Sequence, residues 1–112
     1  MPRSKTNPPI SYLAPGGTYP EGPFVDGTPP AVIAASGFVK KLVFDMGDGW
    51  GSQSAMSKKA GVSQGLISRI VRGESLPDLA TVANLEAALM VDLWEPWSVR
   101  KQTEQTKRSK EV

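Results

Sequence analysis

Apolar residues recur at helical spacing in several stretches of the chain, each bounded by glycine, proline or a small polar residue. This pattern predicts helices over residues 31–46, 53–60 and 64–72, a fourth helix after Asp78, and a final short turn after Asp92. Ser52, Ser63 and Asp78 precede the last three helices and can cap them by accepting hydrogen bonds from exposed backbone N–H groups. No stretch shows convincing strand alternation. The prediction is an all-α bundle of about five short helices.

The two ends of the chain lack this periodicity. Residues 1–30 contain eight prolines and four glycines. Proline removes a backbone donor, and glycine raises the entropy that folding must overcome. We therefore expect a disordered arm over residues 1–30, a folded domain over 31–97 and a basic, flexible, polar tail over 98–112.

Composition excludes several function classes. The chain has no cysteine and no histidine, which excludes disulfides, histidine or cysteine metal sites and the commonest catalytic nucleophiles and bases. The glycines of "GDGWG" lack the lysine and the spacing of a phosphate-binding loop. We expect neither enzymatic activity nor a cofactor. With no run of about 20 apolar residues and no signal-peptide pattern, we also expect a cytoplasmic, nucleoid-associated protein that does not contact a membrane.

The charge is distributed unevenly, although the net charge is only +2. Between Met56 and Gly73 there are four basic residues and no acidic one, namely Lys58, Lys59, Arg69 and Arg72. Between Glu74 and Trp97 there are five acidic residues and no basic one. Two solvated faces would give the same pattern, so the position of the basic segment in the fold must decide its meaning.

The stretch "AGVSQGLISRIVRG" occupies this basic segment at residues 60–73. Two short helices joined by about three residues that include a glycine describe a helix-turn-helix. Gln53, Met56, the "AGVSQ" turn and the continuation "LPDLATVANLEAALMVDLW" resemble the Cro and lambda-repressor-like family of DNA-binding domains, also called the XRE type. The resemblance spans roughly residues 31–95 and implies a bundle of five short helices that binds double-stranded DNA.

Two departures from the family pattern stand out. Ser57 occupies the usual position of an alanine, where a hydroxyl can bond back into its own helix. Val71 and Met46 stand where the family often has a glutamate and its arginine partner. Because packed apolar residues can replace a buried ion pair, we predict that the side chains of Met46 and Val71 touch.

The resemblance also implies a set of DNA-contacting residues. The second helix of the pair enters the major groove, where side chains near its start read base edges. The predicted base-contacting residues are Gln64, Gly65, Ser68 and Arg69. The predicted phosphate-contacting residues are Gln53, Ser63, Arg72, Lys58 and Lys59. The alternative is that these are ordinary solvated residues of exposed helices.

These features predict a sequence-specific transcriptional regulator. Because the family that the chain resembles is concentrated in bacteria and phages, the resemblance implies a bacterial or phage repressor. Two alternatives stay open: an antitoxin that binds its toxin through the proline-rich arm, and a protein-interaction module that has lost DNA binding. By analogy we expect a homodimer through residues 89–97, with binding as a monomer as the alternative. The residues proposed for that contact are Leu89, Val91, Leu93, Trp94 and Trp97.

Overall fold

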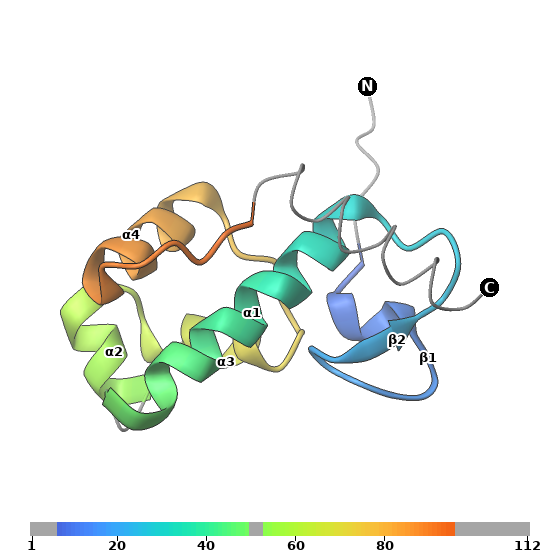
Figure 1. Cartoon of the computed structure of the whole chain (residues 1–112), viewed down its shortest axis with the longest axis horizontal. Coiled ribbons are helices and arrows are strands. Elements are labelled where there is room, and N and C mark those ends of the chain that lie inside the picture. The colour runs from blue at the N-terminus through green and yellow to red at the C-terminus, as the bar shows by residue number, and fades with distance from the viewer. Residues whose placement is uncertain (1–6, 50–52, 96–112) are drawn as a thin grey trace.

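Four α-helices and a small N-terminal hairpin make up the part of the protein that the structure describes. The computed structural model describes residues 7–49 and 53–95 of the 112-residue chain. The helices are α1 (Pro30–Gly49), α2 (Gln53–Ala60), α3 (Gln64–Val71) and α4 (Leu79–Leu89), and α1 runs from the hairpin at one end to α2 at the other (Figure 1). The predicted helical bundle is confirmed, with four helices in the described residues instead of about five.

Local signals define the ends of the last three helices. The Ser63 hydroxyl accepts from the Leu66 N–H at 3.1 Å and begins α3, and Asp78 Oδ1 accepts from the Thr81 N–H at 2.7 Å and begins α4. Gly61, with φ +70°, makes the left-handed turn between α2 and α3. Both predicted caps are therefore confirmed, whereas the predicted cap Ser52 lies outside the described residues.

A single hydrophobic core joins all four helices. α2 packs against both α3 and α4, and α1 contacts α3. The core residues are Phe38, Val39, Leu42, Met56, Val62, Ile67, Ile70, Val82, Leu85 and Leu93. Met46 and Val71 are both half-buried against this core, in agreement with apolar replacements of the ion pair. Their mutual contact stays a prediction.

The segment after α4 returns to α1 without forming a helix. Leu93 is fully buried, and the ring of Trp94 lies 6.0 Å from that of Phe38, measured between centroids. Glu86 Oε2 accepts from the N–H groups of Leu93 at 2.8 Å and Trp94 at 3.0 Å. The expected fifth helical turn is therefore absent from residues 91–95, because Glu86 and not Asp92 satisfies these donors.

The N-terminal segment has regular structure where the sequence analysis expects disorder. After the short 3-10 helix η1 (Pro9–Tyr12), strands β1 (Leu13–Thr18) and β2 (Gly22–Phe24) form an antiparallel hairpin. Leu13 pairs with Phe24 and Thr18 with Gly22, so β1 carries a bulge between these pairs. Apolar alternation marks a strand in a sequence only over several regularly paired residues. These strands are short and bulged, so that signal is absent from their sequence. Residues 1–6 and the predicted tail over 98–112 lie outside the described residues.

The hairpin is seated against Gly73, the buried glycine that follows α3. The Ile10 N–H donates to the Gly73 carbonyl at 3.1 Å. A Cβ at Gly73 would lie 2.7 Å from Ile10 Cγ2 and 2.8 Å from the Tyr19 ring. Burial raises the pKa of Tyr19 to about 12, and its buried hydroxyl has no partner among the described residues. The neutral Tyr19 ring therefore acts as an apolar cover over the end of α3.

The cap of α4 makes folding stability depend on pH. The hydrogen bond from the Thr81 N–H lowers the pKa of the exposed Asp78 from its ordinary value. A carboxyl with a lowered folded pKa stabilises the fold above its unfolded pKa of about 3.9, and this contribution is lost as pH falls through the folded pKa. We expect urea unfolding to show wild type losing stability relative to Asp78→Asn as the pH falls from 5 to 2. A constant difference between the two proteins over that range would contradict this assignment.

Candidate nucleic-acid interface

The turn between α2 and α3 is fixed by Ser57. Its carbonyl accepts from the N–H groups of Gly61 at 2.9 Å and Val62 at 3.3 Å. Its hydroxyl donates to the Val62 carbonyl, so the side chain bonds forward across the turn and not back into α2 as the sequence suggests. This bond satisfies a carbonyl that an alanine would leave without this partner, and it helps to set how α3 leaves α2.

The predicted base-contacting residues share the first two turns of α3. Gln64, Gly65 and Arg69 are exposed, and Ser68 is half-buried, while Ile67 and Ile70 on the opposite face enter the core. A Cβ at Gly65 would lie 3.8 Å from Arg69 Nη1, so the guanidinium folds over the bare backbone of Gly65. The polar face of α3 is therefore open to an approaching duplex, with Arg69 as its longest side chain.

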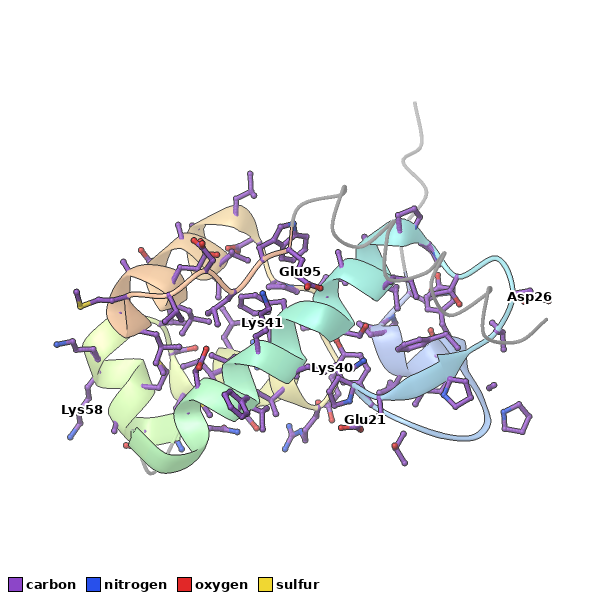
Figure 2. All side chains as sticks on the ribbon, viewed as in Figure 1. Glu21, Asp26, Lys40, Lys41, Lys58 and Glu95 are labelled. Carbon is purple, nitrogen blue, oxygen red and sulfur yellow. The ribbon has the colours of Figure 1, made fainter. Side chains whose placement is uncertain are left out.

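The predicted phosphate-contacting residues occupy three places around α3. Gln53, half-buried, is the first residue of α2, where backbone N–H groups favour an anion. Ser63 accepts a hydrogen bond as the cap of α3, which leaves its own hydroxyl proton available. Lys58 and Lys59 are exposed in the last turn of α2, and Lys58 projects at the end of the molecule away from the hairpin (Figure 2).

Arg72 already has a partner that the sequence analysis did not assign. Its Nε lies 3.1 Å from Glu74 Oε2 and its Nη2 3.2 Å from Glu74 Oε1, a two-pronged pair at the end of α3. The Arg72 and Glu74 side chains are 59% and 43% exposed, so solvent screens the pair and another anion can reach the guanidinium. The sequence offered one signal for this ion pair, since Arg72 and Glu74 lie two positions apart, on either side of Gly73. Glu74 therefore occupies the position that a phosphate would take on Arg72.

Most of the apolar side chains in the predicted dimer region serve the fold of their own chain. Leu93 is fully buried, and Leu89 and Trp94 are half-buried against the core, while Trp97 lies outside the described residues. Met90, 88% exposed, and Val91, 39% exposed, are the accessible apolar residues between 89 and 95. Among the described residues of this region, these two offer apolar surface to a partner, and dimerisation stays a proposal.

Two classes of feature are missing from residues 7–49 and 53–95. These residues contain no cluster of three potential metal ligands among histidine, cysteine, aspartate and glutamate. None of the helices in this part of the chain is long and apolar enough to cross a membrane.

The helix-turn-helix family matches residues 51–93, which contain α2, α3 and α4. This segment therefore resembles a helix-turn-helix domain, which is a DNA-binding and not an enzymatic family. The match supports the XRE and lambda-repressor type that the sequence resemblance implied, and it supports a DNA-binding regulator of this type. No curated protein and no solved structure matches the chain.

Proposed function

We propose that this protein is a sequence-specific transcriptional regulator, a bacterial or phage repressor, that inserts α3 into the major groove. The exposed polar face of α3, which lies within the segment 56–73 that has no acidic residue, carries this proposal. Gln64 can pair with adenine and Arg69 with the O6 and N7 atoms of guanine. Gly65 lets the backbone approach the bases, and Ser68 completes the reading surface.

Phosphate contacts position α3 over its site. Gln53 and Ser63 engage phosphates from the starts of α2 and α3, and Lys58, Lys59 and Arg72 add positive charge around them. Arg72 exchanges Glu74 for a phosphate when DNA binds. With two or three base readers per subunit, at about 1–3 kcal/mol for each good pair, one domain has modest specificity. A dimer that reads two half-sites would raise it.

Selection from a random duplex pool, followed by sequencing of the retained DNA, tests this function. We expect an enriched motif whose retention weakens steeply with salt, with a log–log slope of about −0.9 for each phosphate neutralised. Two symmetric half-sites would indicate a dimer, and one asymmetric site a monomer. No enrichment, together with a protein partner whose binding ignores salt, would instead favour the interaction-module alternative.

A further inference from the structure

A cavity of about 430 Å³ lies between the hairpin and the first half of α1. One wall is the stretch 21–28, and the other is the face of α1 that carries Ile33, Ser36 and Lys40 at helical spacing. The volume falls within the range of about 300–1,000 Å³ that is typical of small-molecule sites. The cavity belongs to neither the helix-turn-helix segment nor the polar face of α3.

Charged, polar and apolar residues share the lining of this cavity. Phe24, Val25 and Ile33 supply the apolar surface, and Lys40 and Asp26 are exposed at the rim. Figure 2 shows Lys40 toward the middle of the molecule, with Glu21 below it, and Asp26 at the outer end of the loop that follows β2. No ion pair in the described part of the chain engages any of these three charged side chains.

This arrangement selects a ligand by its charges. A positive group at one end of an apolar surface and a negative group at the other complement a molecule with the opposite polarity. We propose that the cavity binds a small elongated zwitterion with an apolar middle, whose carboxylate pairs with Lys40 and whose ammonium group pairs with Asp26. Glu21 gives the lining an excess of negative charge, so the ammonium group contributes more to binding than the carboxylate.

Contacts inside the hairpin connect this cavity to the end of α3. The Phe24 ring, which lines the cavity, meets the Tyr19 ring edge to face, with centroids 6.4 Å apart and an interplanar angle of 75°. Tyr19 in turn covers Gly73, whose carbonyl accepts from the Ile10 N–H. A ligand that packs on Phe24 therefore stabilises the seat of the hairpin against Gly73, and slows opening of the Ile10 hydrogen bond.

The test is an NMR titration of the full chain with ε-aminohexanoate, compared with hexylamine and hexanoate, which each lack one charge. We expect saturable shifts at residues 21–40, and an affinity order of zwitterion, then amine, then acid. Lys40→Gln and Asp26→Asn should each weaken binding of ε-aminohexanoate by about two- to fivefold, because both side chains are exposed and solvent screens an exposed ion pair. Saturating ligand should also slow hydrogen exchange at the Ile10 N–H.

Lys41→Gln is the matched control, because Lys41 follows Lys40 on α1 but points to Glu95, with Nζ 3.9 Å from Oε2 (Figure 2). It should bind ε-aminohexanoate as wild type does. The proposal is overturned if no shift saturates, if hexylamine and hexanoate bind as tightly as the zwitterion, or if Lys40→Gln binds like Lys41→Gln. The titration contains no DNA, so its failure would leave the proposed regulator function untouched. A failed DNA selection would likewise leave the proposed ligand site untouched.

Discussion

Replacing Gly73 with alanine should lower the free energy of unfolding by about 2–4 kcal/mol. Part of the loss is conformational, because Gly73 has φ +78°, where an L-residue is strained. The rest is steric, because the new methyl group would lie 2.7 Å from Ile10 and 2.8 Å from Tyr19 and would force the hairpin off the end of α3. Urea unfolding, followed by circular dichroism, measures the change.

Gly61 provides the matched control. It has φ +70°, and a Cβ there would meet nothing within 4 Å, so Gly61→Ala should cost only the conformational part, about 1 kcal/mol. A second test combines Gly73→Ala with Tyr19→Ala, which should make the Gly73 substitution less costly because one of the two obstructing side chains is gone. Equal costs at Gly61 and Gly73 would show that the hairpin does not pack where the structure places it.

The helices around the turn could be predicted from the sequence because their signals are local. α2 and α3 begin at the predicted residues, and the cap of α3 lies one residue before its first turn. The end of α1 was less well predicted, since the helix continues from the predicted residue 46 to Gly49 through glycines that usually interrupt one. In each case the outcome depends on residues within a few positions of the boundary.

The hairpin could not be predicted because its stability comes from residues far along the chain. Proline and glycine in residues 13–24 are typical of disorder when they are considered alone. In the structure they fit a bulged pair of strands, and Ile10 and Tyr19 gain contacts with Gly73, more than fifty positions away in the sequence. Such pairings have no periodic signal, since only the folded α3 provides the surface against which they pack.

The sequence analysis also missed the partners of two acidic residues, Glu86 and Glu74. Glu86 binds two N–H groups seven and eight residues ahead because the chain turns back after α4. Glu74 was counted with the acidic segment 74–97. In the structure it pairs with Arg72, the last basic residue of the preceding segment 56–73. A boundary drawn from charge along the sequence therefore does not mark a boundary on the surface, and Arg72 is less positive in effect than its neighbour Arg69.

Replacing Arg69 with alanine should remove preference at one base position and cost about 1–3 kcal/mol on the selected site, or roughly 5- to 150-fold in affinity. The reason is that Arg69 projects over Gly65 on the exposed face of α3, where no other residue carries a guanidinium that could replace its paired donors. Binding to unrelated duplexes should fall much less. Fluorescence anisotropy with the selected site, and with the same site changed at one position, measures both effects.

Arg72→Ala and Glu74→Gln distinguish a phosphate contact from a base contact. Arg72→Ala should weaken all duplexes about equally and reduce the salt slope by about one phosphate. Glu74→Gln releases Arg72 from its ion pair and removes a negative charge near the duplex, so it should strengthen binding to all duplexes without a change in base preference. If Arg69→Ala also weakened every duplex equally, Arg69 would be a phosphate contact, and Gln64 would be the remaining candidate for base recognition.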